Sequence, residues 1–513
     1  MTSAARHPIP LVGSFDTVAD ALEAAALQHA GLVAYVEGAE RMSFGEWFDR
    51  SDRLAAALVE RGVRPGDVVA IMLPPSIDYA VTFAAIELAG AVATGINIRL
   101  GPREIAAILA QTQPSLVVLD RGAFAPAVVG QVDAGLVLGR DELAMLRTGC
   151  VLGDGRPQRR SSDPAVIIWT SGTTGVPKGA WFDHHGLHAA VASAGVMSEP
   201  YDVKLVSTPF AHAGYMAKLW DQLAWGTSAI IPPAPWTATD MLRLLRDERI
   251  TVAGGVPTQW AKLLEEPGVV DADLSHVRVG LVATAPASPE LIERVSATIG
   301  CALVVRYAMT ESPSITGTEV DDPPAVQFRT VGRPQAGMEV EVRSDAGGVM
   351  PTGDVGRIAV RGACVMRGYW NDPEQTASVL AADGWLLSSD LGFLDPEGNL
   401  VLVGRSSDMY IRGGYNVYPL EVEHVLTEHP LVDRAAVVGT PAPVIGEVGV
   451  AFIVPVDPLR VPSLDELRSW VGDRLADYKS PDRLVVLDTL PLTAMMKVDT
   501  TELGRIALGS SRK

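Results

Sequence analysis

A short apolar run that leads into a glycine-rich loop places the strongest constraint on how this chain of 513 residues can fold. Residues 165–169 read Ala-Val-Ile-Ile-Trp, and their apolar, largely β-branched character predicts a buried strand. Residues 170–179 follow, and in them hydroxyl side chains and glycines precede Lys178. We therefore expect a sheet that presents this loop at one edge.

The composition of the loop predicts that it binds phosphate. Hydroxyl groups can donate hydrogen bonds, glycines let backbone N–H groups approach an anion closely, and Lys178 supplies a mobile positive charge. A Walker loop is excluded because Lys178 precedes Gly179 instead of Ser or Thr. A nucleophile elbow is excluded because Trp169 stands where a glycine is required before the serine. The expected phosphate contacts are Thr170, Ser171, Gly172, Thr173, Thr174, Gly175 and Lys178.

Charge and cysteine content narrow the class of protein. Acidic residues outnumber basic ones by 61 to 42, and the formal net charge of −19 argues against a nucleic-acid partner. Cys150, Cys301 and Cys364 are widely separated and lack metal-ligand spacing, so neither a disulfide framework nor a zinc site is expected. This cysteine pattern fits a reducing cytoplasm, and the N-terminus shows no continuous apolar segment, which speaks against a secretory signal.

Helical patterns and short apolar runs alternate along roughly the first 400 residues. Residues 51–61 show helical periodicity and residues 68–73 form an apolar run, an order typical of α/β layers with buried sheets. The longest apolar stretch, residues 80–98, contains Glu87 and several glycines, so we predict a buried helix leading into a strand rather than a membrane span. The predicted fold class is α/β, with a large N-terminal domain of several subdomains.

In the later part of the chain the predicted helices and strands are shorter than in the first 400 residues. Helices are expected there at residues 419–427 and 464–475, and strands at residues 435–438 and 448–456. The second helix opens with a capping box, which runs from Ser463 to Glu466. These elements predict a small, mobile α+β domain. We place its boundary near Ser407, so that the chain divides into residues 1–405 and residues 406–513.

Five segments stand in a fixed order along the chain. They are Trp-Thr-Ser-Gly-Thr-Thr-Gly-Val-Pro-Lys-Gly at 169–179, Tyr-Ala-Met-Thr-Glu at 307–311, Gly-Trp-Leu-Leu-Ser-Ser-Asp at 384–390, Gly-Arg at 404–405 and Pro-Leu-Thr-Ala-Met-Met-Lys at 491–497. Together they resemble the adenylate-forming, or AMP-binding, superfamily, in particular the acyl-CoA synthetases and fatty-acid-CoA ligases. The resemblance implies activation of a carboxylic acid by ATP, with release of pyrophosphate.

The resemblance also assigns residues to the nucleotide. Tyr307 would stack on adenine, Thr310 would contact phosphate, and Glu311 would hold Mg²⁺, since a carboxylate suits this hard cation. Asp390 would accept hydrogen bonds from the ribose hydroxyls, with Arg405 contacting ribose or phosphate. Thr310 and Glu311 are therefore expected to be catalytic residues as well as nucleotide contacts.

Three positions follow the family pattern less closely. A segment that lines adenine is matched only by Ala285 and Pro286. Lys497 matches a catalytic lysine that enters the active site during adenylation, although Met496 stands where glycine is usual. Ala308 also replaces a glycine, and its methyl group is expected to narrow the acid or nucleotide pocket.

Separate segments imply the sites for the acid and for CoA. His212 is expected beside the acyl pocket, as a gate or wall in the catalytic group, and Gly413 with Gly414 would leave room for the pantetheine arm of CoA. The remaining walls of the acid pocket are expected from Tyr215, Met216, Gly255, Val256 and Ala308. Aromatic and methionine residues at such spacing are equally typical of an ordinary core.

The sequence therefore predicts an acid-thiol ligase that uses ATP, Mg²⁺ and CoA and acts on a hydrophobic carboxylic acid, whether fatty, aromatic or alicyclic. Two alternatives stay open. The acyl group could pass to a separate carrier protein, or the chain could be a non-catalytic nucleotide-binding homologue, because Thr284, Ala308, Ser407 and Met496 depart from the family pattern. The oligomeric state is open too, with a homodimer among the alternatives.

Overall fold

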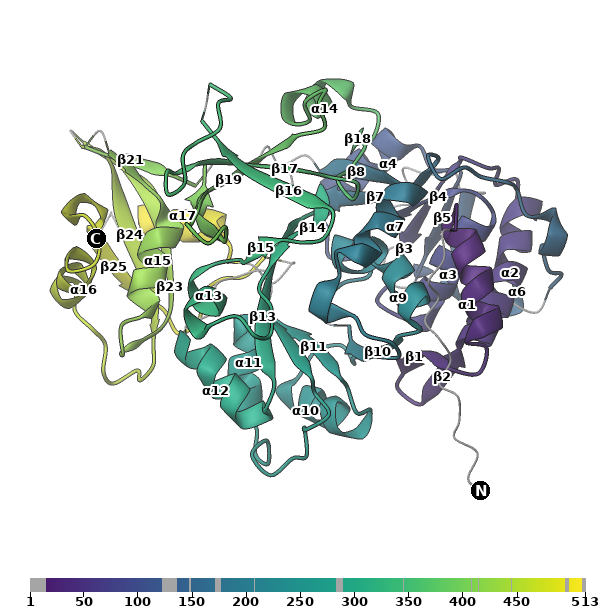
Figure 1. Cartoon of the computed structure of the whole chain (residues 1–513), viewed down its shortest axis with the longest axis horizontal. Helices are drawn as coiled ribbons and strands as arrows, with labels where there is room; N and C mark the ends of the chain where they lie inside the picture. The colour runs from purple at the N-terminus through teal and green to yellow at the C-terminus, as the bar shows by residue number, and fades with distance from the viewer. Residues whose placement is uncertain are drawn as a thin grey trace.

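The structure is a computed structural model, and it describes residues 15–121, 136–146, 149–170, 177–206, 208–282, 289–344, 346–406, 408–413, 415–443, 445–493 and 498–509. Within these residues the chain forms four β-sheets, with helices packed against them (Figure 1). Strands and helices alternate over most of the large domain, which confirms the predicted α/β fold class.

The strand before the predicted phosphate loop lies inside a seven-stranded sheet with the order β18-β8-β7-β4-β3-β5-β6. Strand β7 pairs in parallel with β4 and antiparallel with β8, so the loop joins two neighbouring strands. Thr170 and Lys178 are the partners closest to the loop. The strand predicted at residues 165–169 is confirmed. The strands are β3 (Val68–Met72), β4 (Val92–Gly95), β5 (Leu116–Leu119), β6 (Val137–Gly139), β7 (Pro164–Thr170), β8 (Lys178–Asp183) and β18 (Gly368–Tyr369).

A second sheet has nine strands in the order β15-β14-β13-β12-β11-β9-β10-β1-β2. It is parallel from β13 to β1, and β2, β14 and β15 pair antiparallel at its two edges. The strands are β1 (Val33–Glu37), β2 (Glu40–Ser43), β9 (Val203–Leu205), β10 (Ser228–Ile231), β11 (Val252–Gly255), β12 (Val279–Val282), β13 (Ala302–Met309), β14 (Ser312–Gly317) and β15 (Arg333–Pro334).

Helix α3 shows how the helices of the large domain are built. All its residues except Asp78 are buried, and Ser76 caps its first turn because its Oγ accepts a hydrogen bond from the N–H of Tyr79 (3.2 Å). It leads into β4, as predicted for residues 80–98. The helices are α1 (Val18–Gln28), α2 (Phe44–Glu60), α3 (Ile77–Leu88), α4 (Pro102–Thr112), α6 (Arg140–Leu146), α7 (His184–Ala192), α8 (Ala213–Met216), α9 (Leu219–Trp225), α10 (Ala238–Asp247), α11 (Pro257–Leu264), α12 (Pro289–Ile299), α13 (Pro324–Arg329) and α14 (Pro373–Val379).

The main apolar core packs the N-terminal helices onto the seven-stranded sheet. Leu54 and Phe83 are fully buried there, and burial of one such side chain contributes about 1.5–3 kcal/mol. The indole Nε1 of Trp47 donates a hydrogen bond to the carbonyl of Ala80 (3.1 Å), which ties α2 to α3. A second cluster around Trp260 packs α10, α11 and α12 onto the nine-stranded sheet. No helix in the described ranges has both the length and the apolar character to cross a membrane.

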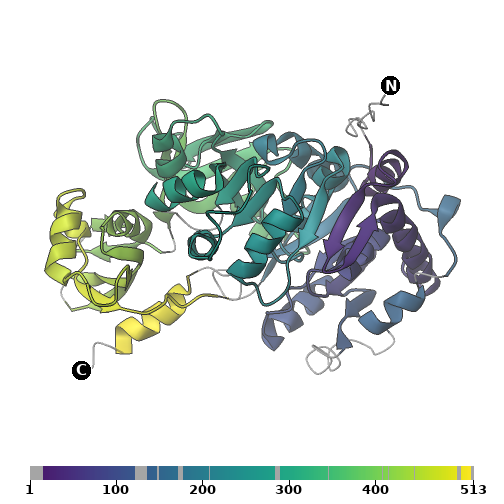
Figure 2. The ribbon, with the colours of Figure 1, turned by 90° about the horizontal axis from the view of Figure 1, so that it is seen from below.

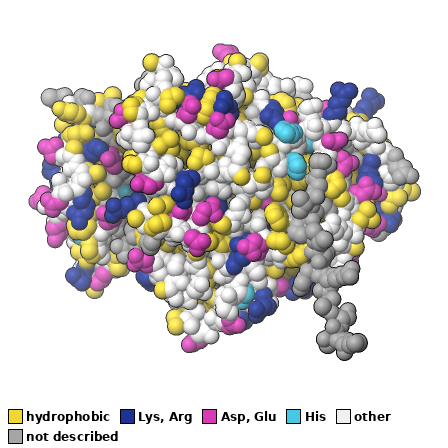
Figure 3. Space-filling model, in the orientation of Figure 1, with side chains coloured by type: hydrophobic (Ala, Val, Ile, Leu, Met, Phe, Trp, Pro, Cys, Tyr) yellow, Lys and Arg dark blue, Asp and Glu magenta, His cyan; other side chains and the backbone are white. Residues whose placement is uncertain are grey.

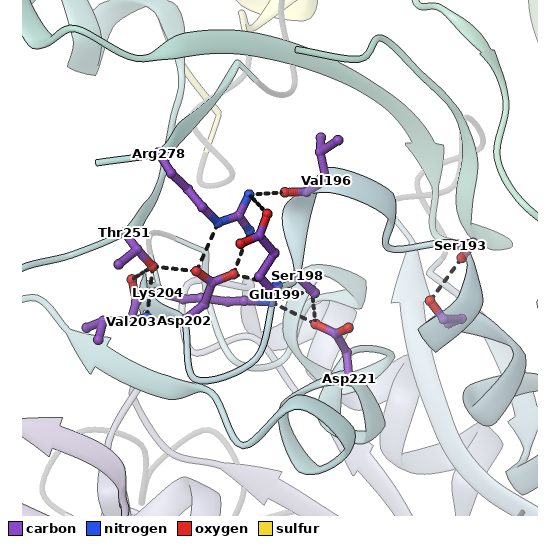
Figure 4. A network of polar contacts seen from close by, with 11 residues as sticks. Ser193, Val196, Ser198, Glu199, Asp202, Val203, Lys204, Asp221, Thr251 and Arg278 are labelled. Atoms are coloured by element: carbon purple, nitrogen blue, oxygen red, sulfur yellow. Dashed lines mark hydrogen bonds and ion pairs between the residues drawn. The ribbon is translucent and has the colours of Figure 1, made fainter. Parts of the chain in front are cut away.

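A polar network joins three parallel strands where they begin (Figure 4). Asp202 precedes β9, Thr251 precedes β11 and Arg278 precedes β12. The Asp202 carboxylate accepts hydrogen bonds from Arg278 Nε (3.0 Å) and Nη2 (2.6 Å), from Thr251 Oγ1 (2.6 Å) and from the N–H of Glu199 (2.7 Å). One buried carboxylate thus fixes the relative positions of three strands in the nine-stranded sheet.

A four-stranded antiparallel sheet completes the large domain. Its order is β16-β17-β19-β20, and it lies between the small domain and the rest of the large domain in Figure 1. The sheet carries the predicted aspartate and arginine of the ribose site on two adjacent strands. The strands are β16 (Met338–Arg343), β17 (Gly356–Gly362), β19 (Leu386–Leu394) and β20 (Leu400–Arg405).

The chain after β20 forms a smaller α+β domain, as predicted. Its sheet has the order β22-β21-β24-β23, with β25 paired to β24, and it has apolar clusters of its own around Leu467 and Phe452. Figures 1 and 2 place it at the end of the molecule opposite to α1 and α2. The elements are β21 (Tyr410–Arg412), β22 (Tyr415–Val417), α15 (Pro419–Thr427), β23 (Val432–Ala442), β24 (Gly446–Pro455), α16 (Leu464–Gly472), β25 (Arg483–Val486) and α17 (Thr500–Gly509).

Surface charge is mixed on the face shown in Figure 3, where Lys and Arg side chains are interspersed with Asp and Glu side chains. This pattern differs from the clustered basic surface that is typical of nucleic-acid-binding proteins. It agrees with the acidic net charge of −19.

Candidate functional site

A buried carboxylate, Asp390, lies where three strands meet. Its Oδ2 accepts a hydrogen bond from the hydroxyl of Tyr307 (2.5 Å), and its Oδ1 accepts one from Nε of Arg405 (2.9 Å). Asp390 and Arg405 are direct partners in β19 and β20, whereas Tyr307 comes from β13. The four-stranded and nine-stranded sheets therefore meet at this carboxylate, and the structure brings three of the predicted site residues together.

Burial and nearby charge determine the protonation of Tyr307 and the accessibility of Asp390 and Arg405. Burial, reinforced by the Asp390 carboxylate, raises the pKa of Tyr307 well above its ordinary value, so the hydroxyl remains a donor near neutral pH. Asp390 is only 8% exposed, but the Arg405 side chain is 52% exposed. Among the described residues, the two Nη groups of Arg405 have no hydrogen-bond partner, so they are available to a bound anion.

Thr310 and Glu311 form the tight turn between β13 and β14, in which Met309 pairs with Ser312. The motif that contains Thr310 and Glu311 therefore forms a strand followed by a turn. Glu311 Oε1 accepts a hydrogen bond from the hydroxyl of Tyr369 (2.7 Å). The carboxylate is therefore held close to the surface of the sheet instead of extending freely into solvent.

Lys178 reaches the same tyrosine from the other side. Its Nζ lies 5.3 Å from the centroid of the Tyr369 ring and donates a hydrogen bond to Oε1 of Gln375 in α14 (2.8 Å). Neither Tyr369 nor Gln375 lies in a motif that the sequence identifies. The pairing of β18 with β8 brings them here, and that pairing joins segments far apart in the chain without a sequence signal of its own.

Glu311 fits the expected metal ligand. Among the described residues its second oxygen, Oε2, has no hydrogen-bond partner, and no group of three or more His, Cys, Asp or Glu side chains there could hold an ion alone. Mg²⁺ in nucleotide sites commonly takes one or two carboxylates and completes its shell with phosphate oxygens and water. One carboxylate with a free oxygen suits such a shared site.

Part of the predicted site lies outside the described residues, namely segments 171–176, 283–288 and 494–497 together with single positions in the small domain. The roles assigned there stay predictions. They concern Ser171, Gly172, Thr173, Thr174, Gly175, Ala285, Pro286, Ser407, Gly414 and Lys497.

His212 caps the short helix α8, because its Nδ1 accepts a hydrogen bond from the N–H of Gly214 (3.1 Å). Tyr215 and Met216 follow in that helix and are buried in the main core. The Tyr215 ring stacks on Phe210 with the centroids 3.7 Å apart, and its hydroxyl lies 2.8 Å from that of Tyr35. These contacts are those of core residues, and the proposed contact of Tyr215 and Met216 with the acid stays a prediction.

Gly255 ends β11 directly beneath the indole of Trp260, where a Cβ atom would come within 2.9 Å of Nε1. This close approach requires glycine. Val256 occupies the N-cap position of α11, and Ala308 is exposed on β13 beside Tyr307. Ala308 and Tyr307 are consecutive residues of β13, so their side chains point to opposite faces of the strand, and the predicted narrowing of the pocket by Ala308 stays a prediction.

A cavity of about 390 Å³ opens beside α7 and α9. Its volume is in the range of small-ligand pockets. The sequence analysis did not find it, because small residues on a helix form no recognisable motif. The lining residues are His188, Ala189, Val191, Ala192, Ala194, Gly195, Ser198 and Trp225.

Gly413 is the described half of the predicted CoA loop. It has a positive φ of 59°, a conformation that favours glycine, and its N–H donates a hydrogen bond to the carbonyl of Ile445 (2.8 Å). This contact ties the loop to the β-hairpin of β23 and β24, so the backbone at Gly413 is set by the small domain.

Comparison with known proteins matches two family models along the chain. The AMP-binding enzyme model matches residues 22–370, and the model of the AMP-binding enzyme C-terminal domain matches residues 421–497. A 3-[(3aS,4S,7aS)-7a-methyl-1,5-dioxo-octahydro-1H-inden-4-yl]propanoyl:CoA ligase from Rhodococcus jostii (strain RHA1) is 33% identical, over 94% of this chain and 97% of that protein. A feruloyl-CoA synthase from Amycolatopsis sp is 34% identical, over 93% of this chain and 96% of that protein.

A solved structure supports the same assignment. The crystal structure of ATP-bound MatB from Rhodopseudomonas palustris matches with a TM-score of 0.86 and 29% identity, over 96% of this chain and 99% of that chain. Both the large and the small domain therefore have counterparts in known enzymes of this type. The chain belongs to the AMP-binding enzyme family and is an adenylate-forming enzyme of the acyl-CoA ligase group.

Proposed function

We propose that this enzyme activates a hydrophobic carboxylic acid with ATP and transfers the acyl group to CoA. In the first half-reaction a carboxylate oxygen attacks the α-phosphorus, and the bond from that phosphorus to pyrophosphate breaks. In the second, the CoA thiolate attacks the acyl carbonyl and AMP leaves. The observation that carries the proposal is the convergence of Tyr307, Asp390 and Arg405 from two sheets on one half-open site.

The nucleoside of ATP is assigned to this convergence. Each Asp390 oxygen accepts one hydrogen bond within the protein and keeps a lone pair for a ribose hydroxyl. The Tyr307 ring, held through its hydroxyl, faces adenine together with Ala285 and Pro286, and the free Nη groups of Arg405 meet ribose or phosphate. The protein contacts are formed before the nucleotide arrives, which reduces the ordering cost of binding.

The phosphates are assigned to the loop from Thr170 to Lys178 and to the β13–β14 turn. Lys178 donates to phosphate oxygens, Thr310 contributes a hydroxyl, and Glu311 holds Mg²⁺ through its free oxygen. When bound, Mg²⁺ offsets negative charge on the phosphates. Lys178 retains two further N–H donors beyond its bond to Gln375, so it binds phosphate without leaving its present position.

The small domain is assigned two tasks. Lys497 neutralises the charge on the carboxylate and phosphate oxygens during adenylation, and the loop at Gly413 and Gly414 admits the pantetheine arm afterwards. A rotation of residues 406–513 about the segment after Arg405 exchanges the two tasks. The turn there is short, since β20 ends at Arg405 and β21 begins at Tyr410.

A bulky apolar acid is favoured by two observations. The relatives named above act on a feruloyl group and on a propanoyl group that carries a fused bicyclic ring. In this chain the cavity beside α7 and α9 is lined mainly by apolar residues and lies in the same domain as His212. We assign the acid to the space between that cavity and the β13–β14 turn.

A panel of carboxylic acids tests the substrate class and the acceptor together. Release of pyrophosphate is measured with fatty, aromatic and alicyclic acids and with amino acids, and each active acid is then incubated with CoA or with a phosphopantetheinylated carrier protein. We expect apolar acids to be active and a CoA thioester to form. A thioester on the carrier alone would contradict transfer to CoA, and activity confined to amino acids would contradict the assigned pocket.

A further inference from the structure

Tyr369 contacts both charged groups assigned to the phosphates. Its hydroxyl donates to Glu311 Oε1 (2.7 Å), and its ring lies under the Lys178 ammonium, which is 5.3 Å from the ring centroid. We propose that Tyr369 is a positioning residue that keeps Glu311 and Lys178 apart and oriented for ATP with its Mg²⁺. This inference rests on the proposed function, in which those two residues bind metal and phosphate.

The backbone around Tyr369 is tied to both groups that it would position. The N–H of Met366 donates to the carbonyl of Glu311 (2.8 Å), and the N–H of Trp370 donates to the carbonyl of Gly179 (2.7 Å). Tyr369 itself pairs with Ala180 in β8, the strand that begins with Lys178. A single short strand, β18, thus connects the β13–β14 turn to the end of the phosphate loop.

Helix α14 fixes this strand from outside. The N–H of Tyr369 donates to Oγ1 of Thr376 (2.9 Å), and Gln375, one residue earlier, accepts the hydrogen bond from Lys178 (2.8 Å). At Gly368 an added Cβ would come within 2.9 Å of the Thr376 side chain, so only glycine permits this approach. The tyrosine and the lysine are therefore supported by adjacent residues of one helix.

The chemistry of the arrangement explains why a tyrosine serves here. Lys178 and Glu311 carry opposite charges, yet they form no ion pair in the described structure. A direct ion pair would occupy the ammonium that phosphate needs and the carboxylate that Mg²⁺ needs. Tyr369 gives each charge a neutral partner, a π face for the ammonium and an O–H donor for the carboxylate. Both groups therefore stay oriented without neutralising each other.

The test separates the metal-linked role of the hydroxyl from a general structural role. Calorimetry measures the dissociation constant of ATP with saturating Mg²⁺ and of ATP in excess EDTA, for the wild type, Tyr369→Phe, Glu311→Gln and the double variant. Phenylalanine keeps the ring that faces Lys178 and removes only the donor to Glu311. Tyr201→Phe is the matched control, because the buried Tyr201 hydroxyl has no hydrogen-bond partner among the described residues.

We expect Tyr369→Phe to raise the dissociation constant of ATP with Mg²⁺ about tenfold, since a hydrogen bond to a charged group is lost, and to change that of metal-free ATP less than about twofold. In the double variant, the tyrosine substitution should add less than about twofold to the loss caused by Glu311→Gln, because Tyr369 acts through that carboxylate. Tyr201→Phe should bind as the wild type does in both conditions.

Three outcomes would overturn the inference. Wild-type affinity of Tyr369→Phe for ATP with Mg²⁺ would show that the hydroxyl does not position Glu311, while leaving the proposed function intact. Equal losses with and without Mg²⁺ would show a general structural role instead. If the wild-type protein bound no ATP under either condition, the proposed function itself would fail and the inference with it.

Discussion

At the residue scale, Asp390 is the centre of the proposed nucleotide site, because it accepts hydrogen bonds from both Tyr307 and Arg405. The variant Asp390→Asn keeps the shape of the side chain but loses its charge and one acceptor. We expect the KM for ATP to rise about tenfold or more, since hydrogen bonds to a charged group are being weakened. Pyrophosphate release at varied ATP concentration measures this, with the exposed Asp433→Asn as a control. An unchanged KM would contradict the ribose assignment.

His184 gives a second residue-scale prediction, which concerns pH. Burial, with the positive charge of Arg159 as a further cause, lowers the pKa of His184 to about 4. Between pH 6.5 and about pH 4, His184 is protonated in the unfolded chain but stays neutral in the folded protein. Stability from this group is therefore complete above pH 6.5 and is lost as the pH falls through that window.

The variant His184→Asn isolates this contribution. Asparagine offers an acceptor for the Val18 N–H, which donates to Nδ1 of His184 (3.2 Å) in the wild type. Glu87 lies 3.8 Å from the ring, and burial raises its pKa, so it opposes the trend in both proteins. Between pH 6.5 and 5 we expect the wild type to lose about 2 kcal/mol more unfolding free energy than the variant. Urea denaturation measures the difference, and equal losses would argue against the buried neutral ring.

The residues of the proposed nucleotide site could be predicted from the sequence to the extent that they lie within continuous motifs. Tyr307, Asp390 and Arg405 were found in this way, and the structure brings them together. Tyr369 and Gln375 were not found, because their position depends on how a two-residue strand pairs with a distant one. Short-range patterns carry no information about such a contact.

At the element scale, the network around Asp202 predicts a stability effect (Figure 4). Removing this buried carboxylate leaves Arg278 without its main partner, and breaking such a pair costs about 3–5 kcal/mol. We expect Asp202→Ala to lower the melting temperature by about 3–6 °C, because the unfolding entropy of a large domain reduces the shift that each kcal/mol produces. Asp247→Ala, which breaks an exposed ion pair with Arg246, should change it by about 2 °C at most. Scanning calorimetry compares them, and equal shifts would contradict the bracing role.

Elements with local signals were predicted best. Helix α15 has the predicted bounds of residues 419–427, and the capping box of α16 forms, with Ser463 Oγ accepting from the Glu466 N–H (3.2 Å) and Glu466 Oε2 accepting from the Ser463 N–H (2.7 Å). Strands β23 and β24 differ from prediction, since they pair from Val432 to Ala442. Cross-strand pairing extends strands into residues whose own propensities do not favour them.

At the scale of the whole molecule, the proposed rotation assigns the two half-reactions to different surfaces of the small domain. The variant Lys497→Ala should slow adenylation about a hundredfold, because a charge is removed from the site where phosphate charge develops. Thioester formation from preformed acyl-adenylate should change less than about threefold, since the lysine is absent from that arrangement. Single-turnover assays of each half-reaction separate the two. Equal losses in both would contradict the assigned rotation.

The large and small domains were predicted because the expected helices and strands become shorter after residue 405, and both domains are present. The order of strands within the sheets was not predictable. The nine-stranded sheet places β1 beside β10 and β9 beside β11, pairings that depend on long-range packing rather than local pattern. The proposed site lies between sheets, so neither the depth of the acid pocket nor the identity of the acid could be predicted from the sequence.

Acid-dependent exchange of labelled pyrophosphate into ATP tests the central claim most directly, because it requires a reversible acyl-adenylate. With an active acid from the panel and Mg²⁺, we expect label to appear in ATP, and omission of either the acid or Mg²⁺ should abolish the exchange. Binding of ATP without any exchange, across the whole panel of acids, would contradict carboxylate activation and favour a nucleotide-binding protein without catalysis.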